Sequence, residues 1–235
     1  MSVARRAVLV LFDIDGTLLI RAADAHRDAL HAAITEVWGM DLTGVLVETG
    51  GRTDPDIARD ILLRGGVDPR SIDDGFDAFR EATVRQYARR VPADLSAHVA
   101  PGALAALENL DGDAAMRLSL VTGNLEPVAR LKLARAGIGR RFVHGQGGFG
   151  SDSEDRADLP AIARERAGRV WNDGAPWPRE RTVVVGDTPR DIACARADGV
   201  AVVAVATGPF DAPDLQDADA VLEDLHELRS ALGAL

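Results

Sequence analysis

Short apolar runs alternate with segments of helical periodicity along most of the chain. Residues 7–12 (AVLVLF) form a continuous run rich in β-branched residues, as expected of a strand covered on both faces in a parallel sheet. Similar runs predict strands at residues 117–121, 182–185 and 200–205, with shorter candidates at 142–143 and 220–222. Helices are predicted between them, with Pro near their starts or Gly near their ends, at residues 102–110, 127–136, 159–167 and 189–197. This alternation predicts an α/β fold with a doubly wound, mostly parallel sheet.

Residues 21–97 follow a different pattern and contain no convincing strand. Helical periodicity covers residues 22–38 and 55–63, and one helix or two are predicted in residues 72–90. The sequence therefore predicts two domains: an α/β core of residues 1–20 and 98–235, and a helical cap of residues 21–97. The segment 144–155, rich in Gly and Asp, is predicted to be a loop.

The chain has 235 residues, with 27 Lys and Arg against 37 Asp and Glu, and a formal net charge of −10. A protein with this negative charge repels phosphate backbones and anionic lipids. We therefore expect neither nucleic-acid polymers nor membranes as partners. The only cysteine, Cys194, excludes an intramolecular disulfide, and the apolar run before Asp13 is too short for a secretory signal or a membrane span. A cytoplasmic protein is expected. Lys132 is the only lysine, so an anionic ligand would need a metal ion or an arginine.

Polar residues follow three of the predicted strands. Asp13-Ile14-Asp15-Gly16-Thr17 comes directly after the first strand, and Thr122-Gly123-Asn124 follows the second. A third strand runs into Gly186-Asp187-Thr188-Pro189-Arg190-Asp191. Each segment alone could be an ordinary turn or helix cap. Because the carboxyl ends of parallel strands meet at one edge of a sheet, where ligands bind, the three together predict an active site.

The motifs DIDGT, VTGN and GDTPRD occur in this order, with a helical insertion after the first. The chain thereby resembles the haloacid dehalogenase (HAD) superfamily, and more narrowly its phosphoglycolate-phosphatase-like hydrolases with a helical cap in the first cap position. This resemblance covers nearly the whole chain and implies a Rossmann-like core.

By this resemblance Asp13 is the nucleophile, which forms an aspartyl phosphate, and Asp15 is the general acid and base. A Mg²⁺ cofactor is implied, bound by the Asp13 and Asp187 carboxylates and by the backbone carbonyl of Asp15. Asp191 would lie behind these ligands and orient them. Thr122 is implied to bind phosphoryl oxygens.

The substrate-binding candidates come from two parts of the chain. Gly123, through its backbone N–H, and Asn124 follow the second strand, whereas Arg52 and His26 belong to the cap. Arg52 could meet a substrate carboxylate or a second phosphate, although a solvated role is about as plausible. For His26, a position on the polar face of an amphipathic helix is the stronger alternative.

The chain departs from the family at the third motif, which is normally a lysine at the start of the helix before the GD strand. No lysine lies there, and Arg156 occupies the matching position. A guanidinium can supply the positive charge, although its fork differs from a point ammonium. Lys132 is the rival candidate, but its position in the helix after Thr122-Gly123-Asn124 indicates that it lies elsewhere.

We therefore predict a Mg²⁺-dependent phosphatase that acts on a small phosphorylated metabolite, such as phosphoglycolate or a sugar or nucleotide monophosphate, as a monomer or homodimer. The alternatives are a phosphomutase of the β-phosphoglucomutase kind and a non-catalytic metabolite-binding protein with the HAD fold. A dehalogenase is disfavoured because Asp15 is present, and a Schiff-base phosphonate hydrolase because residues 21–97 contain no lysine.

Overall fold

A single parallel sheet of six strands organises the computed structural model, which describes residues 7–235. The first six residues of the predicted core therefore lie outside the described residues. The strand order is β3-β2-β1-β4-β5-β6, and every neighbouring pair is parallel. The strands are β1 (Val8–Phe12), β2 (Met116–Thr122), β3 (Gly148–Phe149), β4 (Thr182–Gly186), β5 (Ala201–Val205) and β6 (Ala220–Leu222). The predicted α/β fold with a doubly wound parallel sheet is confirmed.

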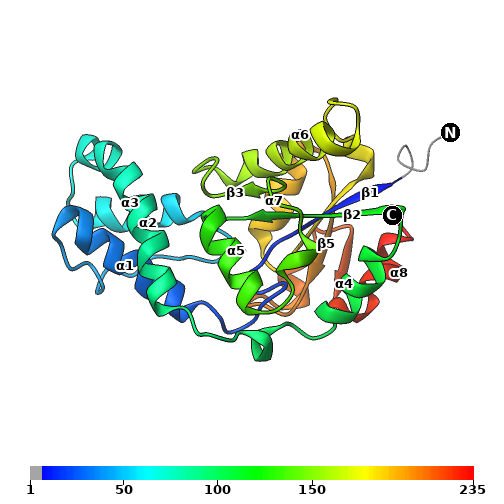
Figure 1. Ribbon diagram of the computed structural model, residues 1–235, viewed down its shortest axis with the longest axis horizontal. Helices are drawn as coiled ribbons and strands as arrows, with labels where there is room; N and C mark the ends of the chain where they lie inside the picture. The colour runs from blue at the N-terminus through cyan, green and yellow to red at the C-terminus, as the bar shows by residue number, and fades with distance from the viewer. Residues whose placement is uncertain (1–6) are drawn as a thin grey trace.

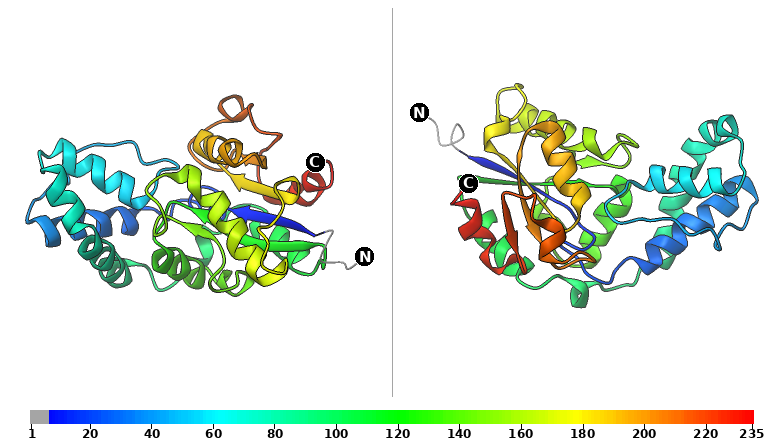
Figure 2. Two further views of the ribbon diagram at one scale, coloured as in Figure 1. Left: turned by 90° about the horizontal axis from the view of Figure 1, so that it is seen from above. Right: turned by 180° about the vertical axis from the view of Figure 1, so that it is seen from behind.

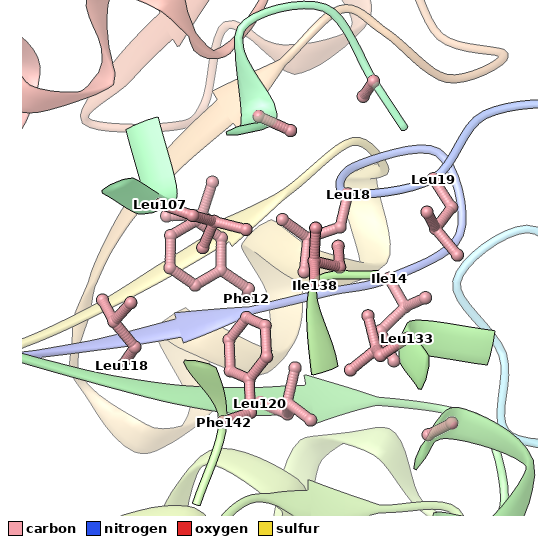
Figure 3. Packing of buried hydrophobic residues seen from close by; sticks show 14 of the residues in the cluster. Phe12, Ile14, Leu18, Leu19, Leu107, Leu118, Leu120, Leu133, Ile138 and Phe142 are labelled. Carbon is pink, nitrogen blue, oxygen red and sulfur yellow. The ribbon is translucent and has the colours of Figure 1, made fainter. Parts of the chain in front are cut away.

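One predicted strand and one predicted loop were wrong. Residues 142–143 do not form a strand, and the sheet edge is instead β3, which lies inside the predicted loop. Phe142 is buried because its ring packs edge-on against Phe12, with the ring centroids 6.2 Å apart (Figure 3). The apolar pair at 142–143 thus reflects core packing from a loop and not strand pairing.

Helices cover both faces of the sheet, which explains the continuous apolar run of β1. Val10 and Phe12 face one buried cluster, whereas Leu9 and Leu11 face another on the opposite side. The first cluster includes residues of α4 (Ala103–Asp111), α5 (Glu126–Arg135) and α8 (Leu228–Leu232). The second includes residues of α6 (Leu159–Trp171) and α7 (Pro189–Asp198). Short 3-10 helices connect these elements: η2 (Ser96–His98), η3 (Gly139–Arg141), η4 (Arg156–Asp158), η5 (Arg179–Arg181), η6 (Ala212–Leu215) and η7 (Leu225–Glu227).

The inserted segment forms three helices with an apolar core of their own, and we call this segment the cap. They are α1 (Asp24–Trp38), α2 (Asp54–Arg64) and α3 (Pro69–Arg90), so the third predicted region is one helix. The cap stands beyond one end of the sheet, on the left in Figure 1. Both views of Figure 2 place it at the opposite end of the molecule from α8. The domain boundaries at residues 20/21 and 97/98 stay a prediction.

No helix in residues 7–235 combines the length and the apolar character that crossing a membrane requires.

Candidate active site

One cavity of about 1250 Å³ lies between the strand ends and the cap. Of the predicted site residues, all except Asp191 line it: Asp13, Asp15, Thr122, Gly123, Asn124, Arg156 and Asp187 from the core, and His26 and Arg52 from the cap. The expectation that three strand ends meet at one edge of the sheet therefore agrees with the structure.

The carboxylates of Asp13, Asp187 and Asp191 form a buried cluster, with ligand atoms within 4.8 Å of one another. Asp187 follows β4, and its Oδ1 accepts a hydrogen bond from Thr17 Oγ1 at 2.9 Å. Its Oδ2 is buried and has no hydrogen-bond partner in the protein. A buried carboxylate oxygen without a partner is costly, so this atom indicates a missing ligand.

The electrostatics of the cluster are unfavourable to negative charge. Burial, together with repulsion from Asp191 and Asp13, raises the pKa of Asp187 to about 9. Burial also raises the pKa of Asp13, to about 7, against the lowering effect of Arg156. A divalent cation would relieve this repulsion, and carboxylate oxygens are ligands that Mg²⁺ prefers. The residues present therefore fit the predicted metal, and its binding by Asp13 and Asp187 stays a prediction.

Two glycines, Gly16 and Gly208, let the backbone approach the Asp187 carboxylate closely. Gly16 has φ +92°, and a Cβ placed on it would lie 2.1 Å from Asp187 Oδ2. A Cβ on Gly208 would lie 1.7 Å from the same oxygen. Only glycine lets both loops approach the Asp187 carboxylate this closely, so the sequence Asp15-Gly16 has a structural purpose beyond turning the chain.

Arg156 is the cation beside the predicted nucleophile. Its Nη2 donates to Asp13 Oδ1 at 3.0 Å and to Asp191 Oδ1 at 2.5 Å, and only 8% of the residue is exposed. The second oxygen of Asp191 belongs to the capping box of α7, where it accepts from the Thr188 N–H at 3.0 Å. Asp191 therefore fixes Arg156 beside Asp13, whereas the roles predicted for both residues stay predictions.

Lys132 takes a place in the site that the sequence did not reveal. Its Nζ donates to Asp15 Oδ1 at 2.8 Å and to Asp15 Oδ2 at 2.6 Å, and the side chain is fully buried. Burial alone would raise the pKa of Asp15, but Lys132, His26 and Asn124 together hold it below its ordinary value. Lys132 thus does not take the third-motif position beside Asp13, which agrees with the expectation, but its contact with Asp15 makes it part of the site.

The apolar stripe of α5 is the sequence signal that indicates a buried Lys132. Lys132 lies on the same helix face as Val128, Ala129 and Leu133, all of which are buried. A lysine within an apolar helix stripe must have a buried anionic partner, because an isolated buried ammonium is very unfavourable.

The Thr122-Gly123-Asn124 segment contacts both Asp15 and the cap. Asn124 Nδ2 donates to Asp15 Oδ2 at 2.8 Å and to Thr122 Oγ1 at 2.9 Å. The backbone carbonyl of Gly123 accepts from the Asp54 N–H of the cap at 2.8 Å. The amide group of Asn124 therefore orients Asp15, while Thr122 lines the cavity with its predicted phosphoryl-binding role still a prediction.

The two cap candidates are engaged inside the protein. The Arg52 guanidinium donates to Asp56 at 2.6 and 2.7 Å and to Asp60 at 2.8 Å. The His26 ring has Nε2 3.0 Å from Asp54 Oδ2 and Nδ1 3.1 Å from Lys132 Nζ. Neither side chain has an obvious free donor for a substrate, so their predicted binding roles are not supported by this arrangement.

Further contacts hold the cap against the core. Thr53 Oγ1 donates to the backbone carbonyl of Glu154 at 2.7 Å, and Arg59 pairs with the carboxylate of the same residue at 2.7 and 2.8 Å. Arg190 of α7 donates to the carbonyl of Gly50 at 2.6 Å. Residues 50–53, which precede α2 and which we call the cap loop, thus contact the core, and residues 50–52 also line the cavity.

Comparison with known proteins identifies the family of this chain. The model of the haloacid dehalogenase-like hydrolase family matches residues 10–196, which include every predicted site residue. The chain belongs to this family. Membership confirms the resemblance to the HAD superfamily that the motifs indicated, and it confirms the hydrolase class.

Two relatives of this HAD-like hydrolase are phosphoglycolate phosphatases. The protein from Rhodospirillum rubrum is 30% identical over 231 residues, which cover 95% of this chain and 90% of the relative. The protein from Agrobacterium fabrum is 29% identical over 231 residues, with 95% and 91% covered. Among solved structures, a β-phosphoglucomutase from Clostridium difficile has a TM-score of 0.68 at 15% identity and covers 97% of this chain and 98% of its own. The likeness to that structure supports the shared fold. The predicted class, a HAD-like phosphoric monoester hydrolase, is confirmed by the family and the two phosphatases.

Proposed function

We propose that the protein is a Mg²⁺-dependent phosphatase that hydrolyses a small phosphorylated metabolite through an aspartyl phosphate on Asp13. One observation carries the proposal: Asp13 accepts a hydrogen bond from the guanidinium of Arg156 and shares a buried carboxylate cluster with Asp187, whose Oδ2 has no hydrogen-bond partner in the protein. This arrangement combines a nucleophile, a fixed cation and an incomplete ligand set in one cavity.

In the proposed first step, an oxygen of Asp13 attacks phosphorus, and the bond from phosphorus to the leaving oxygen breaks. Mg²⁺, when bound by Asp13 and Asp187, supplies positive charge that lets an anionic nucleophile approach a phosphate. Arg156 adds a second, permanent positive charge on the Asp13 side, because its Nη2 contacts that carboxylate. Arg156 is buried, so water screens its charge little.

Asp15 is the proposed proton donor and acceptor. Its carboxyl lines the same cavity as Asp13 and accepts hydrogen bonds from Lys132 and Asn124. For the first step Asp15 must carry a proton, against the lowering of its pKa by Lys132, and it gives this proton to the leaving oxygen. In the second step it takes a proton from the attacking water, so that its protonated form is restored. The cap loop covers the cavity during both steps and limits the access of bulk water.

The substrate class follows from the relatives and from the site. Two phosphoglycolate phosphatases resemble this chain over nearly its whole length, which supports a phosphoglycolate-like ester as the first compound to test. Sugar and nucleotide monophosphates remain in the proposed class. The cytoplasmic location and the monomeric or homodimeric state stay predictions from the sequence.

Phosphate release tests the proposal. The wild type should hydrolyse p-nitrophenyl phosphate and at least one metabolite of a panel with Mg²⁺ and lose this activity in EDTA. Asp13→Asn should abolish turnover, whereas Asp77→Asn, an exposed carboxylate of α3 that serves as the matched control, should not change it. Activity in EDTA, or in Asp13→Asn, would contradict the mechanism.

The same panel separates the alternative functions. A phosphomutase would convert a sugar phosphate into its isomer without net release of phosphate. A non-catalytic binding protein would bind a metabolite and release no phosphate from any ester.

A further inference from the structure

A chain of buried polar side chains runs from the cap to the catalytic acid. Asp54 Oδ2 lies 3.0 Å from His26 Nε2, His26 Nδ1 lies 3.1 Å from Lys132 Nζ, and Lys132 contacts both oxygens of Asp15. Lys132 is 0% exposed, Asp54 2% and His26 7%. The proposed chemistry at Asp13 assigns no task to Asp54, His26 or Lys132, although burying them is unfavourable unless each is fully paired.

The pairing is complete at the lysine. An ammonium has three donors, and Lys132 has three acceptors: the two oxygens of Asp15 and Nδ1 of His26. An Nδ1 that accepts leaves the ring proton on Nε2, from which it is donated to Asp54. The ring of Tyr87 packs against both groups, with its centroid 5.6 Å from that of His26 and 6.0 Å from Lys132 Nζ. The side chain of Lys132 therefore has a single well-defined position.

The members of this chain come from different parts of the fold. Lys132 lies on α5 of the core, whereas His26 lies on α1 and Asp54 at the start of α2, both in the cap. Asp54 Oδ2 also accepts from the backbone N–H of Leu125, at the start of α5, at 2.8 Å. The cap thus bonds the core helix at its first turn and again at the lysine, so a displaced cap would leave Lys132 without its partner His26.

We propose that Lys132 is a positioning residue for Asp15 and that the cap residues His26 and Asp54 hold it in place. The acid–base group is then correctly oriented only while the cap contacts the core. This inference rests on the proposed phosphatase function. It assigns the buried chain a task in the first step, where a proton passes from the Asp15 carboxyl to the leaving oxygen as the bond from phosphorus to that oxygen breaks.

The nature of the leaving group provides the test. An alkoxide is a poor leaving group and needs the proton from Asp15, whereas p-nitrophenolate is a stable anion that departs without one. General acid catalysis contributes typically 10²–10⁴-fold. Lys132→Met should therefore lower kcat/KM, which reports the first step and not the later attack of water, by about 100-fold or more for an alkyl phosphate such as the best metabolite of the panel. It should lower kcat/KM for p-nitrophenyl phosphate by less than about tenfold. A general loss of structure would reduce both rates by the same factor.

The cap members are tested separately, because Lys132→Met could fail to fold. His26→Gln removes the ring nitrogen Nδ1 that accepts from Lys132, and Asp54→Asn removes the negative charge that pairs with His26 Nε2. Each should lower the rate ratio of alkyl phosphate to p-nitrophenyl phosphate by about tenfold, a smaller effect than that of removing the lysine itself. The matched controls are His226→Gln, an exposed histidine beside α8, and Asp68→Asn, at the start of α3, where Asn caps a helix equally well. Both should keep the wild-type ratio.

Equal losses for both esters in all three variants, or an unchanged ratio in His26→Gln and Asp54→Asn, would overturn the positioning role. Failure of the proposed function itself gives a different result, because the wild type would then hydrolyse neither ester with Mg²⁺.

Discussion

Replacing Arg156 by Met tests the central electrostatic argument of the site. The substitution removes the guanidinium while it keeps an unbranched apolar side chain. Arg156 contacts Asp13 and Asp191 through the same nitrogen, Nη2, whereas its Nε has no hydrogen-bond partner. The variant therefore leaves two buried carboxylates without their shared cation.

The structure sets the size of the expected effect. Removal of one partner from a buried ion pair destabilises a protein by about 3–5 kcal/mol. The pKa of Asp13 is already raised to about 7, and uptake of a proton would relieve part of this penalty at low pH. At pH 8 we expect the free energy of unfolding to fall by about 3 kcal/mol. Loss of a fixed charge beside the reacting phosphoryl group should lower kcat by about 10²–10³-fold.

Urea denaturation and phosphate release measure the two quantities on the same preparation. Arg164→Met is the matched control, because Arg164 is an equally buried arginine of α6. Its guanidinium donates to the Asp198 carboxylate at 2.6 and 2.7 Å, and it does not line the cavity. It should lose a similar free energy of unfolding but keep its turnover per folded molecule. Arg156→Lys should recover at least tenfold of the lost rate, since a single nitrogen makes both contacts.

Turnover of Arg156→Met within tenfold of the wild type would refute this reasoning and assign the charge to another cation. An equal loss of turnover in Arg164→Met would show that the effect is one of stability alone.

Two further predictions concern the metal and the cap. The pKa of Asp187 is raised to about 9 and that of Asp13 to about 7, so the metal-free protein should lose stability as the pH rises from about 4 towards 9. Because Mg²⁺ needs the ionised carboxylates, it should raise Tm more at pH 9 than at pH 6. A Mg²⁺-induced rise in Tm that is equal at both pH values, or that persists in Asp187→Asn, would contradict this. A Cβ at Gly123 would lie 2.0 Å from the backbone oxygen of Arg52, so Gly123→Ala should push the cap loop away from the core. Overpacking of this kind costs about 1–3 kcal/mol, and we expect kcat/KM for the best metabolite to fall at least tenfold. Gly112→Ala, whose Cβ would meet nothing closer than 3.6 Å, should behave as the wild type, and wild-type kcat/KM in Gly123→Ala would exclude the tight approach of cap and core.

Much of the fold and the acidic centre could be predicted from the sequence because both depend on local patterns. A strand buried on both faces must be apolar throughout, so β1 stands out as a continuous run. The polar residues that end β1, β2 and β4 meet because parallel strands share an edge, so Asp13, Thr122 and Asp187 could be placed together before any contact was known. Arg156, by contrast, was assigned only through the resemblance to the family, whose third motif has a lysine at the matching position.

The tertiary structure alone decided which partner each long side chain takes. Lys132 and Asp15 are 117 residues apart, and nothing in the local sequence of either indicates their pairing. Arg52 could be considered for substrate binding until its guanidinium was found between the carboxylates of Asp56 and Asp60 on α2. The physical reason is the same in both cases. Backbone pattern and strand direction are set by residues close in sequence, whereas the partner of a buried charge is set by which helices pack against one another.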